Sequence, residues 1–100
     1  MADVLLSLTM PVDVSQHVED LLLSRPDIVR GFTAAHVDGH GSVVRLVEAA
    51  ELVRGHTPRV QIQTVGEEAD MRAALALIKS NLPQANVFYW LMPVIELGRL

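Results

Sequence analysis

Apolar and polar residues alternate in four short stretches of the chain and repeat with helical spacing in two longer ones. Alternation places successive side chains on opposite faces of a β-strand, whereas apolar positions three and four residues apart form one face of an α-helix. The pattern predicts strands at 4–10, 31–37, 59–65 and 85–92, and helices at 13–24 and 67–81. Residues that interrupt helices and strands lie at or just after most of the predicted ends. They are Pro11, Pro26, Gly66, Pro83 and Pro93.

The two predicted helices also carry polar residues that are typical of helix ends. We expect Asp13 to be the N-cap of the first helix, because an aspartate side chain accepts hydrogen bonds from the free N–H groups of a first turn. The second helix begins with Glu67 and Glu68 and has Lys79 near its end. This distribution of charge suits the helix dipole.

A glycine-rich turn at 38–41 follows the second predicted strand, and residues 42–55 separate this turn from the third strand. The apolar residues within 42–55 have helical spacing, and Gly55 is a suitable helix stop. We therefore expect a loop that carries a short amphipathic helix.

The order of elements predicts an α+β fold, a ferredoxin-like βαββαβ sandwich with both helices on one face of the sheet. One hundred residues suit a single domain, 1–100. The last strand is apolar on both faces, with Val87, Tyr89 and Leu91 on one and Phe88, Trp90 and Met92 on the other. Soluble proteins avoid large exposed apolar patches, and no element is left to cover the second face. We therefore expect a homo-oligomer in which these faces pack together.

Composition and charge exclude several classes of protein. Half of the residues are hydrophobic and 20% are charged, which excludes a disordered chain. The chain has no cysteine, so disulfides, thiolate chemistry and cysteine zinc sites are excluded. A net charge of −4 argues against nucleic acid as a partner. Because no leader and no long apolar run is visible, we expect a cytoplasmic protein without direct membrane insertion.

Three polar residues near the end of the second predicted strand have the spacing of a metal site. His36, Asp38 and His40 lie two residues apart, so an extended chain would project all three side chains from one face. Two imidazoles and a carboxylate can ligate a divalent metal ion. The alternative is a solvated polar turn, because Gly39 and Gly41 disfavour regular extended geometry.

A second polar group surrounds His56, with Arg54 and Arg59 nearby. This group suits an anion or the acidic patch of a partner, and a solvated loop is the alternative. No serine lies in a nucleophile-elbow sequence, and no P-loop motif is present. Because no catalytic constellation is visible, we expect that the protein is not an enzyme.

Five short motifs follow one another along nearly the whole chain. They are Gly31-Phe32-Thr33, Gly39-His40-Gly41, Ala50-Glu51 with Val53 and Gly55, Tyr89-Trp90 with Met92-Pro93-Val94, and Gly98-Arg99-Leu100. In this order and spacing they resemble a small family of PII-like proteins of unknown function, related to the nitrogen regulatory protein P-II. Members of that family are often encoded beside heavy-metal efflux pumps.

The resemblance implies a trimeric regulatory or signalling protein with a PII-like, ferredoxin-like fold. In PII trimers, ligands bind in clefts between subunits, and a long T-loop between strands two and three contacts a target protein. Residues 39–58 occupy the T-loop position here. The resemblance implies a ligand site that includes Gly39, His40 and Gly41, with an adenine nucleotide or a divalent metal ion as candidate ligand and a membrane efflux-pump component as candidate partner.

One loop departs from the PII pattern. PII proteins use a loop rich in glycine and basic residues after the second helix to hold phosphates, whereas residues 81–86 of this chain contain neither glycine nor a cation. The resemblance therefore implies that Arg99, in the C-terminal segment, is the residue that contacts a phosphate. The leading hypothesis is thus a PII-like regulator, and the alternative is a metal-binding chaperone or sensor that uses His36, Asp38 and His40.

Overall fold

The structure is a computed structural model that describes residues 2–40 and 57–100. Its elements, in chain order, are β1 (Asp3–Pro11), α1 (Val12–Leu23), β2 (Thr33–Gly39), β3 (Thr57–Glu67), α3 (Glu68–Asn81) and β4 (Phe88–Pro93). The predicted helix within 42–55 and the predicted ligand residue Gly41 lie outside the described residues. Neither described helix combines the length and apolar character needed to span a bilayer.

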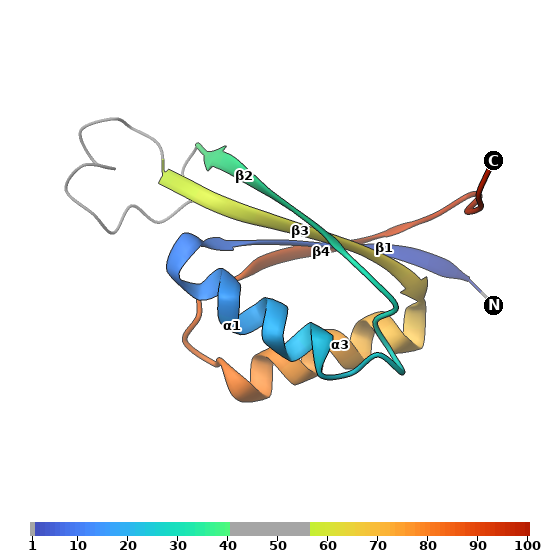
Figure 1. The fold of residues 1–100 in the computed structure, drawn as a ribbon, viewed down its shortest axis with the longest axis horizontal. Helices are drawn as coiled ribbons and strands as arrows, with labels where there is room; N and C mark the ends of the chain where they lie inside the picture. Colours follow the sequence, from blue (N-terminus) through green and yellow to red (C-terminus); the bar gives the residue numbers. More distant parts are fainter. Residues whose placement is uncertain (1, 41–56) are drawn as a thin grey trace.

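The four strands form one antiparallel sheet in the order β2-β3-β1-β4. β1 and β3 are the central strands, and β2 and β4 are the edges. Both helices pack against the same face of the sheet (Figure 1). This arrangement is two split βαβ units, which confirms the predicted ferredoxin-like sandwich.

The hydrophobic core lies between the two helices and the face of the sheet that they cover. Alternation puts every second residue of β1 on this face, and β3 contributes the residues paired with them. All of the core side chains are at most 7% exposed, and they include Val4, Leu6, Leu8 and Met10 of β1, Val60 and Ile62 of β3, Val18 and Leu22 of α1, and Met71, Ala74 and Ile78 of α3. The predicted strand and helix stripes therefore meet as expected.

Gly66 does not break the third strand, as the sequence suggested. β3 continues to Glu67, and Gly66 pairs with Val4 of β1. A Cβ added at Gly66 would lie 2.9 Å from the Cε of the buried Met71. A side chain at this position would therefore require the buried Met71 side chain of α3 to shift.

The first helix begins one residue before the predicted N-cap. The N-cap is Pro11, with φ −58°, and its side chain makes no capping hydrogen bond. Asp13 lies instead in the first turn, where its charge still suits the helix dipole. The prediction was wrong because the helix follows β1 directly, and proline has a φ compatible with the start of a helix.

The second strand is observed two residues later than predicted, at Thr33–Gly39. Residues 24–32 are needed to cross from the end of α1 to the sheet. Arg25 and Asp27 form an ion pair in this connection, in which the guanidinium donates two hydrogen bonds to the carboxylate, at 2.8 and 2.9 Å. Near its end, the Thr64 hydroxyl donates to the carbonyl oxygen of Gly31 at 2.6 Å.

The fourth strand is observed at Phe88–Pro93, three residues later than its predicted start. The chain turns at Asn86, which has a φ of +54° and is the one non-glycine residue with positive φ among the described residues. Asparagine tolerates this left-handed conformation better than most residues. Extended pairing with β1 therefore starts only after the turn.

Candidate ligand-binding site

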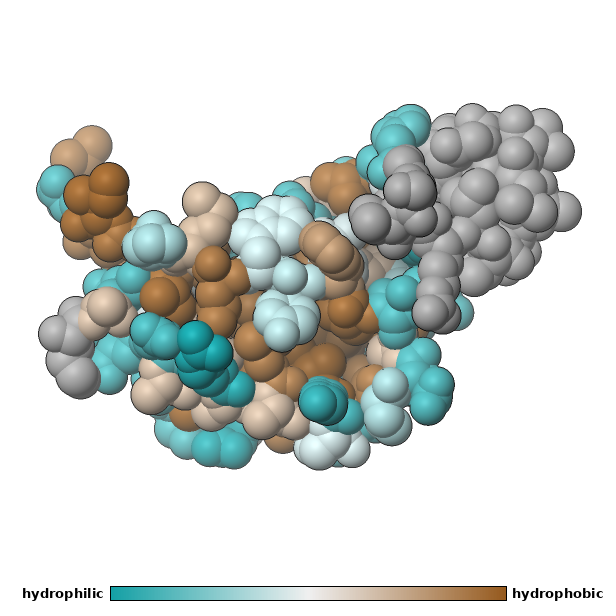
Figure 2. Space-filling model, turned by 180° about the vertical axis from the view of Figure 1, so that it is seen from behind, coloured by the Kyte–Doolittle hydropathy of each residue, from teal (hydrophilic) through white to brown (hydrophobic). Residues whose placement is uncertain are grey.

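The face of the sheet opposite the helices, called the open face below, carries apolar and aromatic side chains with no element of the described chain over them. The register places Phe88, Trp90 and Met92 of β4 on this face, since they pair with Thr9, Ser7 and Leu5 of β1. Phe88 and Met92 are about half exposed. The view from behind, toward the side where β4 lies, shows hydrophobic side chains together with paler ones in the middle of the molecule (Figure 2). The predicted apolar second face of the last strand is thus confirmed.

The prediction for the helix-facing side of the same strand was less accurate. Tyr89 pairs with Leu8 and is on the helix side, as alternation predicted. Its side chain is nonetheless 53% exposed. β4 is an edge strand, and α3 covers the sheet only in part at this position, so Tyr89 borders the core instead of filling it.

A cleft of about 340 Å³ lies where β1 and β2 end and β3 begins. We call it the open-face cleft, because its strand residues belong mainly to the open face. Its lining residues are Thr9, Val37, Asp38, Gly39, His40, Arg59, Gln61, Asn86, Phe88 and Trp90. Its volume falls within the range of roughly 300–1,000 Å³ that is typical of small-molecule sites.

Arg59 gives the open-face cleft a positive charge in a sheltered position. It pairs with Pro11 on one side and with Val37 on the other, and it is only 4% exposed. A guanidinium group is planar, remains charged at all physiological pH values and presents several donors to an anion. Asp38, His40 and Arg59 each take part in at least one further interaction, so a ligand would have to join or replace those contacts.

Two aromatic rings form another wall of the open-face cleft. Phe88 and Trp90 are two residues apart on β4, and their ring centroids are 5.9 Å apart at an interplanar angle of 66°, an edge-to-face arrangement. Both side chains keep exposed surface. Such rings offer a planar ligand a stacking surface.

The structure brings together some of the predicted site residues and separates others. Gly39, His40 and Asp38 all line the open-face cleft. His36, which pairs with Val60 on the helix-facing side of the sheet, does not line it. Within 2–40 and 57–100, no group of three or more metal-ligating side chains is close enough to share a metal ion. The described geometry therefore does not gather His36, Asp38 and His40 into a metal site, and metal binding stays a prediction.

Arg99 lies in the C-terminal segment, and it is exposed. This segment ends at the opposite end of the sheet from the last residues of β2 (Figure 1). Within one chain, Arg99 therefore does not reach the open-face cleft. Its predicted role as a phosphate ligand would require a neighbouring copy of the chain.

Sequence reasoning missed several residues of the open-face cleft. Arg59 was recognised only as part of a basic group in a loop, and Asn86 and Gln61 were not singled out. The available signal was the position of Arg59 at the start of a strand that follows a long connection, where binding residues are often placed. No local pattern indicates that Asn86 comes close to β2 and β3, because the pairing of distant strands creates that proximity.

Comparison with known proteins places the chain in a family and identifies its fold. A family model described as "Protein of unknown function (DUF3240)" matches residues 1–100. No curated protein matches the sequence. A DUF3240 family protein from Shewanella baltica OS155 has a solved structure with a TM-score of 0.79 and 20% identity, and the match covers 100% of this chain and 98% of that one.

PII-like proteins share the same fold. CPII, a nitrogen regulatory PII-like protein from Thiomonas intermedia K12 solved with ADP, AMP and bicarbonate bound, gives a TM-score of 0.72 at 16% identity over 100% of this chain and 97% of its own. A putative PII-like signalling protein from Thermus thermophilus gives 0.64 at 14% identity over 94% and 90%. The chain therefore has a PII-like, ferredoxin-like fold and belongs to the DUF3240 family of proteins of unknown function.

Proposed function

We propose that this protein is a small, non-enzymatic regulatory protein that binds an anionic ligand with a planar ring in the open-face cleft. The observation that carries the proposal is the buried Arg59 beside the Phe88–Trp90 ring pair in one cleft. A guanidinium group favours phosphate or carboxylate, and the rings favour a flat base. An adenine nucleotide combines both properties, and CPII, of the same fold, was solved with ADP and AMP.

The remaining parts of the proposal concern assembly and the partner. We infer that three copies pack their open faces together, because Phe88, Trp90 and Met92 would otherwise remain in water. In a closed symmetric trimer, a neighbouring copy would add residues such as Arg99 to the cleft. We further infer that residues 39–58 contact a partner protein, for which a component of a heavy-metal efflux system is the candidate. The support is that Gly39 and His40 at the start of this segment, and Arg59 directly after its end, line the cleft.

A ligand screen on the purified protein tests the proposal. Melting temperatures are measured with ADP, AMP, 2-oxoglutarate, bicarbonate, zinc and copper, and hits are followed by calorimetry. A ligand that binds the native state raises the melting temperature by mass action. We expect binding of an adenine nucleotide that weakens about tenfold or more in Arg59→Gln, since charge-assisted hydrogen bonds contribute about 1.5–3 kcal/mol.

The controls separate the cleft from general charge effects. Arg72→Gln removes the same charge from an exposed ion pair on α3 and should leave the affinity unchanged. The nucleotide should also be recovered intact after long incubation, because the proposed role includes no reaction. Binding that is equal in the Arg59→Gln variant, or no binding of any anion tested, would contradict the proposed site.

Metal binding through His40 is the second candidate, and the same screen tests it. Zinc or copper should then raise the melting temperature in the native chain but not in the His40→Ala variant. Imidazole ligates a metal ion in its neutral form, so this stabilisation should decrease as the pH is lowered. A metal response that survives the His40→Ala substitution would exclude this residue as a ligand.

A further inference from the structure

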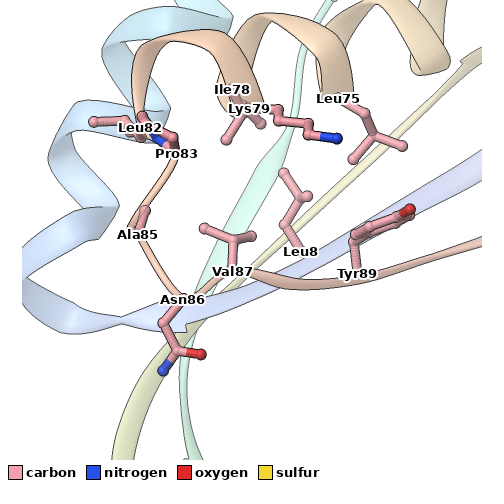
Figure 3. A pocket seen from close by; sticks show the side chains of 10 residues that line it. All are labelled: Leu8, Leu75, Ile78, Lys79, Leu82, Pro83, Ala85, Asn86, Val87 and Tyr89. Atoms are coloured by element: carbon pink, nitrogen blue, oxygen red, sulfur yellow. The ribbon is translucent and has the colours of Figure 1, made fainter.

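A second cleft lies on the other side of the sheet, between α3 and the edge strand β4, and we call it the helix-side cleft. Its volume is about 370 Å³. It is lined by Leu8, Leu75, Ile78, Lys79, Leu82, Pro83, Ala85, Asn86, Val87 and Tyr89 (Figure 3). The open-face cleft is separate from it, and Asn86 is the one residue that lines both.

The interior of the helix-side cleft is apolar. Leu8 is fully buried and Ile78 is 5% exposed, so both belong to the core. Leu75, Leu82 and Val87 are half-buried around them and still have surface to cover. A ligand body that contacts these side chains must be apolar, because the aliphatic walls offer no partner for a polar group.

The polar groups of the cleft favour an acidic headgroup. Among its described lining residues, Lys79 alone carries a charge, and no carboxylate of the described chain forms an ion pair with it. The Lys79 ammonium extends from α3 toward Leu75, and the Tyr89 ring lies below it along β4 (Figure 3). The Tyr89 hydroxyl is a further donor. Lys79 is exposed, so its ammonium repels a cationic ligand and attracts an anionic headgroup at the mouth of the cleft.

We propose that the helix-side cleft binds a monocarboxylic acid with a short aliphatic chain. The chain lies over Leu75, Leu82 and Val87, and the carboxylate accepts hydrogen bonds from Lys79 and Tyr89. The volume is near the lower end of the range for small-molecule sites, roughly 300–1,000 Å³, which favours a short chain over a long-chain lipid. This site differs in ligand and position from the open-face cleft, so either can fail without the other.

A homologous series of ligands tests the proposal. Straight-chain carboxylates from butanoate to decanoate are titrated below their micelle concentrations, and binding is followed by backbone NMR shifts. Affinity should rise by up to about fourfold per added methylene until the cleft is filled, as apolar burial predicts. The shifts should concentrate at residues 75–89 and leave Gln61 and Gln63 of the open face unchanged.

Two variants separate the headgroup from the chain. Lys79→Gln should weaken carboxylate binding about two- to fivefold, as expected for a charge pair at an exposed lysine, and it should leave the matched primary alcohols unaffected. Arg72→Gln, which removes one positive charge from the same helix outside the cleft, is the control and should change neither. Ala85→Leu should fill part of the cleft and end the gain in affinity at a shorter chain.

Three outcomes would overturn the proposal. The first is that no carboxylate of the series binds saturably. The second is that the alcohols bind as tightly as the acids, or that Lys79→Gln and Arg72→Gln weaken binding equally. The third is that the shifts map to the open face, which would assign the apolar contact to the surface around Trp90 and Met92 instead.

Discussion

Met92 provides the sharpest test of the proposed packing of open faces. It lies in an apolar row of the open face, next to Leu5, which in turn pairs with Val65. Its side chain is 47% exposed in the single chain. The perturbation we choose is Met92→Glu, which places a carboxylate in this row but is tolerated at an exposed edge strand.

The expected effect follows from two contributions. Full burial of a methionine is worth about 1.5–3 kcal/mol, so covering the exposed half contributes about 1 kcal/mol per copy. Removing an unpaired carboxylate from water costs several kcal/mol more. Even a combined loss of about 4 kcal/mol per copy weakens association about a thousandfold. Met92→Glu should therefore be monomeric at concentrations where the native chain is a trimer.

Sedimentation velocity over a range of concentrations measures this effect. Met92→Leu conserves volume and should keep the trimer, and circular dichroism should confirm that both variants are folded. Leu23→Glu adds the same charge on α1, at a side chain that is 66% exposed and away from the open face, and should also keep the trimer. The reasoning fails if the native chain is monomeric, if Met92→Glu stays trimeric, or if Leu23→Glu dissociates the assembly equally.

Three further substitutions test the fold by chemical denaturation. Ser7→Ala should raise the free energy of unfolding by about 1 kcal/mol, because its buried hydroxyl has no hydrogen-bond partner among the described residues; a decrease would mean that the hydroxyl is satisfied. Gly66→Ala should lower it by about 1–3 kcal/mol, since the new Cβ would crowd Met71; no change would show that Met71 moves freely. The hydrogen bond from Arg25 lowers the pKa of Asp27. Asp27→Asn should therefore lower the free energy of unfolding at pH 7, and this difference should disappear as the pH falls below about 4, where the carboxylate becomes protonated. An equal difference at pH 3 would contradict the ion pair.

The elements of this fold could be predicted because each has a local cause. Strands show alternation, helices show a stripe, and prolines limit both, so the predicted order of strands and helices is correct for the described residues. Several errors have local causes, such as Pro11 at the start of α1 and the turn at Asn86, whereas the error at Gly66 concerns contact with another element. Gly66 was interpreted as a strand break because glycine is often found at such breaks. The structure shows that the strand continues through Gly66 and that the buried Met71 of α3 lies close to it, a contact between distant residues that the local sequence does not reveal.

The candidate site could be predicted only in part, for the same reason. Gly39 and His40 stood out because they lie in a motif, and both line the open-face cleft. His36 and Asp38 have metal-site spacing and lie on the same side of β2, but only Asp38, which is closer to the end of the strand, lines the cleft. Spacing in the sequence predicts which residues share a face of one strand. It does not predict which neighbouring strand or loop completes a site.

The conformation and position of Asn86, which could not be predicted from the sequence, affect both clefts. Residues 81–86 lack the glycine and the cation that PII proteins use in this loop to hold phosphates. The structure gives Asn86 a φ of +54°, so left-handed geometry is available there without glycine. Because the same residue lines both clefts, a change of its conformation would alter the walls of both at once. Ligand titrations of one cleft should therefore be read with the other cleft monitored, since a shift at 82–87 alone does not tell which cleft is occupied.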